Sequence, residues 1–107
     1  MNKRAESLFE EIRNNNVDAF FVTATPNIRY LTGFTGEDAF LLAVNGKIFL
    51  IVDSRFTAQA QNEVFEGVDV VEYKPPILNF LKDLLLKYKV HWLGIEKNRL
   101  SAELFIE

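Results

Sequence analysis

The dipeptide Asn45-Gly46, which separates two apolar runs, constrains the fold of this chain more than any other feature of its sequence. The run before it is AFLLAV and the run after it is KIFLIVD. Asparagine and glycine both tolerate the positive φ that a two-residue hairpin turn requires, so this pattern is the strongest short-range signal for a β-hairpin. The sequence therefore predicts two adjacent antiparallel strands.

Hydrophobic spacing predicts the other elements on both sides of the hairpin. Apolar residues at intervals of three, four and seven are typical of a helix face, and short runs of aromatic and β-branched residues are typical of buried strands. The predicted order is a helix ending at residues 14–16, a strand (18–24), a long loop (27–38), the hairpin (39–53), a helix (54–65), a strand (68–73), a helix (77–88) opened by prolines 75 and 76, and a strand (91–96).

This order predicts an α/β fold with one mixed, five-stranded sheet. Strand-helix-strand units pack as parallel neighbours with right-handed crossovers, while the hairpin requires an antiparallel pair. Helices should then cover both faces of the sheet. Ser101, Glu103 and Leu104 predict the start of a further helix, so we expect the 107 residues to be one domain of a longer protein.

Composition and charge argue against several classes of function. The formal net charge is −3 and the Lys and Arg residues are scattered along the chain, which disfavours nucleic-acid binding. No apolar run reaches the roughly 18 to 20 residues that a membrane span needs, and the charged N-terminal segment is unlike a signal peptide. The chain has no cysteine, which fits a reducing compartment. We therefore expect a cytoplasmic protein that binds neither nucleic acid nor membranes.

The usual signatures of catalytic and metal sites are missing from the sequence. His91 is the only histidine, and without a second ligand at binding spacing it is typical of a structural residue. The glycines of GFTGED (33–38) have the spacing Gly-x-x-Gly, followed by a strand and without Lys-Ser or Lys-Thr, which matches neither nucleotide-binding fingerprint. A metal-dependent nuclease would need acids inside the first strand, and Asp53 and Glu96 at strand ends do not suffice.

Two segments at strand ends are the candidates for a functional contact. The stretch NIRYLTGFTGED (27–38) is longer than a plain turn needs to be. The corner DSRF (53–56) follows a predicted buried strand, where Asp53 or Ser54 can cap the next helix and Asp53 can pair with Arg55. The corner is therefore either a structural turn or a contact made by Arg55, whose planar guanidinium suits carboxylate recognition.

The two segments together resemble the N-terminal domain of the Xaa-Pro peptidases, the family of prolidase, aminopeptidase P and creatinase. The resemblance rests on Asn27-x-x-Tyr30-Leu31-Thr32-Gly33-Phe34-Thr35-Gly36 and on Asp53-x-Arg55 followed by the aromatic Phe56, in this order and spacing. It covers essentially all of residues 1–107. It implies a three-layer α/β/α domain with a mixed five-stranded sheet of the ribonuclease-H-like type, which agrees with the predicted element order.

The resemblance also implies that residues 1–107 are the non-catalytic part of a peptidase. In that family a downstream catalytic domain of the pita-bread type holds two divalent metal ions, commonly manganese, cobalt or zinc, and cleaves proline-containing peptides. The N-terminal domain holds no metal or cofactor; it packs on its own catalytic domain, mediates homodimer contacts and reaches toward the neighbouring active site through the loop after its first strand. The substrate-side or interface residues implied here are Phe34, Thr35, Gly36, Glu37, Asp38, Asp53, Arg55 and Phe56.

Two places depart from the pattern of the family. Glu37 and Asp38 stand where members often have a small polar residue, and Phe56 stands where many have tyrosine. The family itself includes both dipeptidases and aminopeptidases. Two alternatives stay open beside it, namely a stand-alone interaction module without enzymatic context and a small nuclease.

Overall fold

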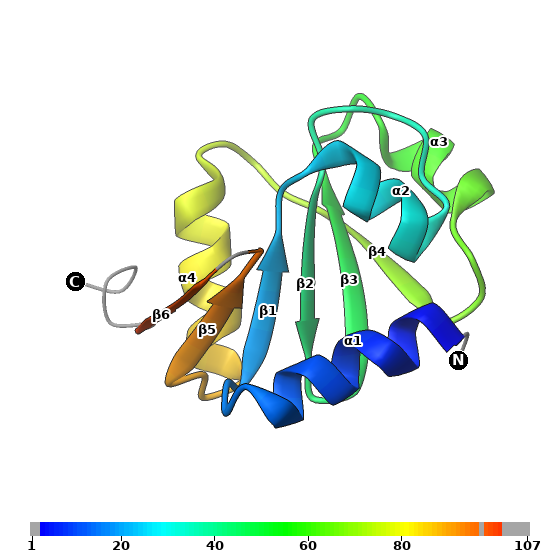
Figure 1. Cartoon of the computed structure of the whole chain (residues 1–107). Coiled ribbons are helices and arrows are strands. Elements are labelled where there is room, and N and C mark those ends of the chain that lie inside the picture. Colours follow the sequence, from blue (N-terminus) through cyan, green and yellow to red (C-terminus); the bar gives the residue numbers. More distant parts are fainter. Residues whose placement is uncertain (1–2, 97, 102–107) are drawn as a thin grey trace.

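The computed structural model describes residues 3–96 and 98–101, which form four helices and six strands (Figure 1). The helices are α1 (Lys3–Asn14), α2 (Thr25–Thr32), α3 (Thr57–Glu63) and α4 (Ile77–Lys87). The strands are β1 (Ala19–Val22), β2 (Phe40–Val44), β3 (Lys47–Val52), β4 (Val68–Glu72), β5 (Trp92–Ile95) and β6 (Asn98–Ser101).

All five predicted strands are present, in one mixed sheet with the order β4-β3-β2-β1-β5-β6. The strand β2 runs antiparallel to β1 and β3, whereas β1 with β5 and β3 with β4 are parallel pairs. The predicted hairpin is confirmed, because β2 and β3 are joined by a turn in which Asn45 and Gly46 have φ angles of 52° and 76°. The carboxyl ends of β1, β3, β4 and β5 consequently lie at one edge of the sheet, the upper edge in Figure 1.

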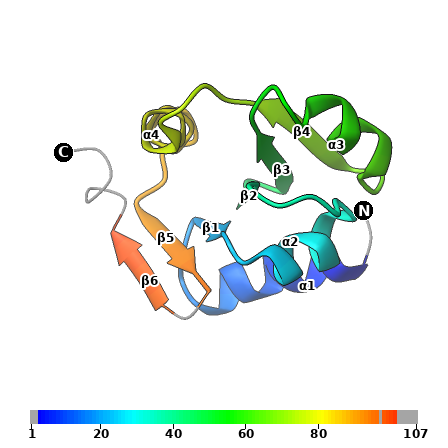
Figure 2. The same cartoon turned by 90° about the horizontal axis from the view of Figure 1, so that it is seen from above.

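Helices cover both faces of the sheet, as predicted, and alternate residues of β1, β2, β3 and β4 point into two separate cores. The adjacent residues Leu41 and Leu42 of β2 belong to different cores. The first core also contains buried residues of α1, α2 and α3, and the second contains Leu81 and Leu85 of α4. Figure 2 shows α4 on one side of the sheet and α1 with α2 on the other. The domain is therefore a three-layer α/β/α arrangement.

The prediction of one continuous loop over residues 27–38 is wrong, because Thr25–Thr32 forms the helix α2. Pro26 lies in its first turn, and Gly33 ends it in the left-handed conformation with φ 86°. Ile28 and Leu31 are three residues apart and both are buried in the first core, which supplies the packing that stabilises so short a helix. Only residues 33–39 connect α2 to β2.

The prediction of a helix beginning at Ser101 is also wrong at that residue. Ser101 is the last residue of β6, which pairs antiparallel with β5 and places Ser101 opposite Trp92. The capping pattern at Ser101 is therefore outweighed by the backbone pairing of β6 with β5. Glu103 and Leu104, the other residues of that prediction, lie outside the described residues.

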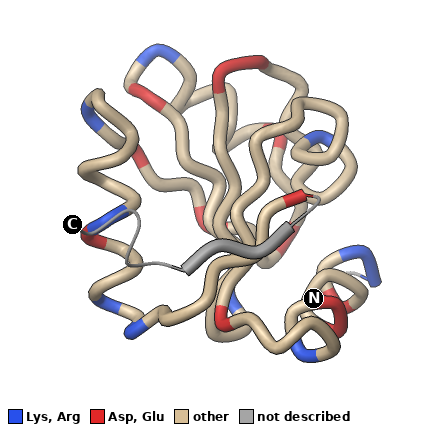
Figure 3. The backbone as a smooth tube through the Cα atoms, turned by 60° about the vertical axis from the view of Figure 1, so that its left-hand side comes forward, with Lys and Arg blue, Asp and Glu red and all other residues tan. Residues whose placement is uncertain are grey.

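Charged residues of both signs are spread over the domain. Figure 3 shows Lys and Arg at separate places along the backbone, with Asp and Glu between them. Among residues 3–96 and 98–101, no helix is long and apolar enough to cross a membrane.

Candidate functional site

The two candidate segments meet at the edge of the sheet where the parallel strands end. Residues 33–39 lead from α2 into β2, and residues 53–56 lead from β3 into α3. The strands β2 and β3 are paired neighbours in which Phe40 lies opposite Ile51, so the end of the loop lies beside the corner. In open α/β sheets, ligands bind outside the carboxyl ends of the strands, which makes this edge a candidate site.

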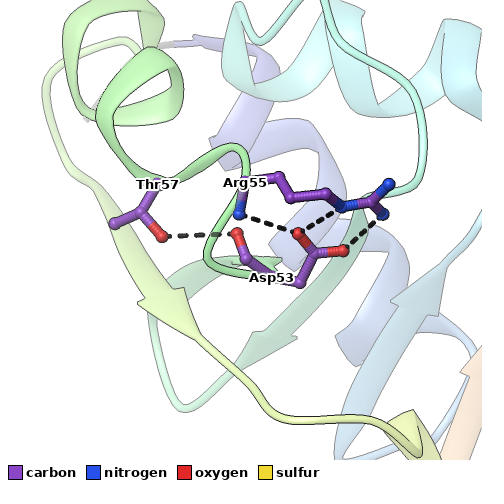
Figure 4. Close-up of polar contacts among 3 residues, drawn as sticks. All are labelled: Asp53, Arg55 and Thr57. Atoms are coloured by element: carbon purple, nitrogen blue, oxygen red, sulfur yellow. Dashed lines mark hydrogen bonds and ion pairs between the residues drawn. The ribbon is translucent and has the colours of Figure 1, made fainter.

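Asp53 and Arg55 form a bidentate ion pair at the corner (Figure 4). Arg55 Nε donates to Asp53 Oδ1 over 3.0 Å, and Nη2 donates to Oδ2 over 2.7 Å. The backbone N–H of Arg55 donates to the same Oδ1 over 2.9 Å, so one carboxylate accepts three hydrogen bonds. Hydrogen bonds from the Arg55 side chain are the main cause that holds the pKa of Asp53 below its usual value, and the same pair raises the pKa of Arg55.

This pair determines what the corner can bind. The predicted pairing of Asp53 with Arg55 is confirmed, but neither Asp53 nor Ser54 is the N-cap of α3, which is Phe56 without a side-chain cap. The carboxylate of Asp53 already occupies Nε and Nη2 of Arg55, the pair of donors that face a carboxylate in this bidentate geometry. Because the Arg55 side chain is 66% exposed, its remaining N–H groups can still meet a partner from the solvent side.

The loop of residues 33–39 is anchored in the first core by Phe34, which packs against Phe56. Phe34 is fully buried, and its ring meets that of Phe56 edge-on with centroids 6.4 Å apart. The guanidinium carbon of Arg55 lies 4.9 Å from the centroid of the Phe56 ring. A Cβ atom on Gly36 would come within 2.5 Å of the Phe34 ring. Of the predicted site residues, Phe34 therefore lies in the core, and Gly36 packs against its ring while remaining half-buried.

Thr35 ties the same loop to α3. Its backbone N–H and its hydroxyl both donate to Glu63 Oε1, over 2.8 and 2.9 Å. Gln59 Nε2 donates to the other carboxylate oxygen over 3.2 Å. The backbone hydrogen bond from Thr35 is the largest cause that lowers the pKa of Glu63. Thr35 is thus exposed, but its polar groups are engaged within the domain.

Glu37 and Asp38 are the acids of the loop that remain directed to solvent. Both are exposed, and Asp38 has a positive φ of 58°. The charge of Asp38 reaches the corner, because it contributes to raising the pKa of Arg55. It also acts on Tyr73, which follows β4 and whose pKa is raised mainly by burial and secondly by the charge of Asp53. Tyr73 is a residue that sequence reasoning missed at this edge, since only the parallel pairing of β3 with β4 brings it there.

Glu96 lies at a strand end, as predicted, but its hydrogen-bond partners were not predicted from the sequence. It follows β5, and its Oε1 accepts hydrogen bonds from the backbone N–H groups of Thr23 and Ala24 over 2.9 and 3.1 Å. Its Oε2 accepts one from Asn27 Nδ2 over 2.7 Å. Burial by itself raises the pKa of Glu96, but these hydrogen bonds outweigh it, so the pKa is lowered. The carboxylate therefore stabilises the first turn of α2, where unpaired N–H groups favour a negative charge.

His91 lies at the start of β5, at the opposite edge of the sheet from the candidate site. Its backbone N–H donates to Asp18 Oδ2 over 2.8 Å, and Trp92 N–H donates to the same oxygen over 2.9 Å. The two hydrogen bonds hold the backbone in place at the start of β5. His91 therefore lies away from the acidic and basic residues of the candidate site.

The carboxylates at the candidate edge do not fit a metal centre. Asp53, Glu63 and Glu96 each accept several hydrogen bonds from within the domain, and among the described residues no three His, Cys, Asp or Glu side chains converge. Divalent ions need several oxygen or nitrogen ligands around one point. Among the described residues, the site therefore presents charge, shape and an aromatic surface rather than a set of metal ligands.

Comparison with known proteins gives a consistent result. The family model described as Creatinase/Prolidase N-terminal domain matches residues 4–107. An uncharacterized peptidase of Bacillus subtilis, YqhT, is 27% identical over 99 residues, which are 92% of this chain and 27% of that protein. The chain thus spans about a quarter of the length of this curated relative.

Solved structures show the same similarity. The crystal structure of an XXA-Pro aminopeptidase from Streptococcus pyogenes has a TM-score of 0.79 and 31% identity, covering 96% of this chain and 78% of that one. That of an X-Pro aminopeptidase from Thermotoga maritima has a TM-score of 0.77 and 30% identity, covering 94% of this chain and 29% of that one.

Proposed function

Because this chain belongs to the creatinase/prolidase N-terminal domain family, we propose that it is the non-catalytic N-terminal domain of an Xaa-Pro dipeptidase or aminopeptidase. The observation that carries the proposal is the match of residues 4–107 to that family, together with a peptidase relative nearly four times as long as the matched segment. In this proposal the two divalent metal ions belong to a downstream catalytic domain, since the described carboxylates do not fit them.

The domain would enclose the active site and contribute oligomer contacts through the edge that carries the candidate site. The residues that support this role are Glu37, Asp38 and the outer side of Arg55, because they are exposed and their partners inside the domain leave them accessible. An Xaa-Pro peptide carries a free α-amino group, which is largely cationic up to a pH of about 7.7 to 8. Acids at the entrance to the active site would attract that group.

The first test compares the chain with the full-length protein. Purified residues 1–107 with added manganese or cobalt should hydrolyse no Xaa-Pro peptide, whereas the full-length protein with the same metal should. Activity of the isolated chain would contradict the non-catalytic role. A stand-alone interaction module, the second candidate, shares the inactivity of the isolated chain, and the coding sequence beyond Glu107 separates the two: a stop codon favours the module, and a downstream domain with metal ligands favours the peptidase.

A second test addresses the acids of the loop. In the full-length protein, the double substitution Glu37→Gln and Asp38→Asn should raise KM for an Xaa-Pro dipeptide by about two- to fivefold with little change in kcat, since only long-range attraction is removed. The difference should shrink at high salt because exposed charges are screened. Glu10→Gln, on the exposed side of α1, is the control and should leave both constants unchanged. An equal loss of activity at all salt concentrations would contradict the electrostatic role.

We also propose a cytoplasmic location and a homodimer for the full-length protein. The absence of cysteine supports the former. Family membership supports the latter.

A further inference from the structure

We propose that a pocket between α1 and α2 binds an acidic peptide segment, through two arginines and two exposed aromatic rings. The pocket has a volume of about 410 Å³, and its walls include Arg4 of α1, Arg29 and Tyr30 of α2, and Phe65, which follows α3. Of the candidate-site residues, only Thr35 also borders it. This binding role is separate from the proposed role in peptide hydrolysis, because it needs only residues of the described chain and no catalytic domain.

Arg4 is held in place by contacts inside the domain. Its Nη1 donates to the backbone carbonyl oxygen of Tyr30 over 2.9 Å. Its guanidinium carbon lies 4.3 Å from the centroid of the Tyr30 ring and 5.6 Å from that of Phe65. A guanidinium fixed against aromatic rings loses little freedom when it binds a ligand, so the ordering cost of binding is reduced.

The positive charge in the pocket is not cancelled locally. Among the described residues, Asp53 and Arg55 form an ion pair over 2.7 Å. Neither Arg4 nor Arg29 forms an ion pair with a described carboxylate. No Asp or Glu lines the pocket. Arg29 does act on Glu63, whose pKa it helps to lower as the smallest of several causes. The Glu63 carboxylate already accepts hydrogen bonds from Thr35 and Gln59.

The aromatic rings favour a peptide over a small anion. The exposed fractions of Tyr30 and Phe65 are 57% and 38%, so both leave apolar surface open to solvent beside the charge. Tyrosine and arginine are enriched among the residues that dominate binding energy at protein interfaces. A carboxylate can meet the guanidinium groups while a neighbouring apolar side chain of the same peptide covers the rings. A free phosphate would use only the charges.

The experiment is a titration of the ¹⁵N-labelled chain followed by NMR, with the acetylated, amidated peptide Glu-Phe-Asp-Glu as probe. We expect shifts confined to the backbone around the pocket and to the Arg4 side-chain N–H, with a Kd below a millimolar. The matched peptide Gln-Phe-Asn-Gln should bind at least tenfold more weakly. Equal binding of the two peptides, or shifts centred elsewhere on the domain, would overturn the proposal.

Four further measurements test the specificity of this binding. Arg29→Gln should weaken binding about three- to tenfold, and because the Arg29 side chain is exposed, the fold should be unaffected. Arg13→Gln, on the same helix as Arg4 but outside the pocket, should bind as the parent chain does. Inorganic phosphate at the same concentration should not displace the peptide; full displacement would overturn the peptide assignment. Shifts that arise on raising the concentration of the chain alone would instead identify a second copy as the occupant.

Discussion

At the scale of single residues, the contact of Gly36 with Phe34 makes a sharp prediction. A Cβ atom at position 36 would lie 2.5 Å from the Phe34 ring, which is fully buried and cannot turn away without opening the first core. We expect Gly36→Ala to lower the free energy of unfolding by about 1 to 3 kcal/mol, the usual range for overpacking. Urea denaturation followed by circular dichroism measures this change.

A double-mutant cycle identifies the cause of that loss. In a Phe34→Leu background the ring is gone, so Gly36→Ala should cost clearly less than it does in the parent chain. The same cost in both backgrounds would show that the backbone of the loop, rather than the ring, requires glycine.

Single residues also show how far the sequence could predict the candidate site. The pairing of Asp53 with Arg55 was predictable, because the two are close in the chain after a buried strand. The engagement of Thr35 by Glu63 was not, since it depends on two segments that the fold brings together from distant parts of the chain. The place of Tyr73 beside the corner and the hydrogen bonds of Glu96 were missed for the same reason.

At the scale of elements, Glu96 should determine the stability of α2. Glu96→Ala removes the acceptor for the N–H groups of Thr23 and Ala24, which lead into α2, and loss of such a cap costs about 1 kcal/mol. The folded state lowers the pKa of Glu96, so its contribution is fully present above the ordinary value of 4.5 and is lost as the pH falls through the lower, folded-state pKa. The difference in urea midpoint between parent and variant should therefore be clear at pH 7 and should shrink toward pH 3.

The matched control is Glu10→Ala, which removes an exposed acid from α1 and should have little effect at either pH. If Glu96→Ala lowers stability equally at pH 7 and pH 3, the negative charge of Glu96 is not what stabilises α2.

The helix α2 also shows where local patterns were misread. Ile28 and Leu31 have helical spacing, Pro26 lies in a first turn and Gly33 ends the helix, so the local signals were present in the sequence. The glycines and threonines after Tyr30 suggested a loop instead. What the sequence could not show is that Glu96, 69 residues after Asn27, completes the start of the helix.

At the scale of the whole molecule, two cores share one sheet and should unfold together. Leu81 of α4 is fully buried in the second core, so Leu81→Ala should lower the free energy of unfolding by about 2 to 5 kcal/mol. Leu86 lies on the same helix and is 51% exposed, so Leu86→Ala should cost less than about 1 kcal/mol. Chemical denaturation measures both variants.

Hydrogen exchange tests whether the two faces are coupled. In Leu81→Ala, amides of α1, on the opposite face of the sheet, should lose protection together with those of α4. Unchanged protection of α1 would mean that the two cores open independently.

The architecture was largely predictable because the hairpin turn, the strand-helix-strand order and the apolar spacing all favour the same mixed sheet. The register of the sheet places Asn45 and Gly46 where the pattern predicted them. The added strand β6 was not predicted, because a short edge strand is stabilised by its neighbour β5 rather than by its own sequence.

The pairing of β1 with β5 has a consequence for synthesis on the ribosome. One edge of β1 stays unpaired until residues 93–95 have been made, and the start of α2 lacks its acceptor until Glu96 follows. The two ends of the Thr23–Glu96 contact are 73 residues apart, which at typical rates of about 5 to 20 residues per second corresponds to roughly 4 to 15 seconds. During that interval the hairpin β2–β3 already covers the other edge of β1, so the emerging chain exposes one strand edge rather than two.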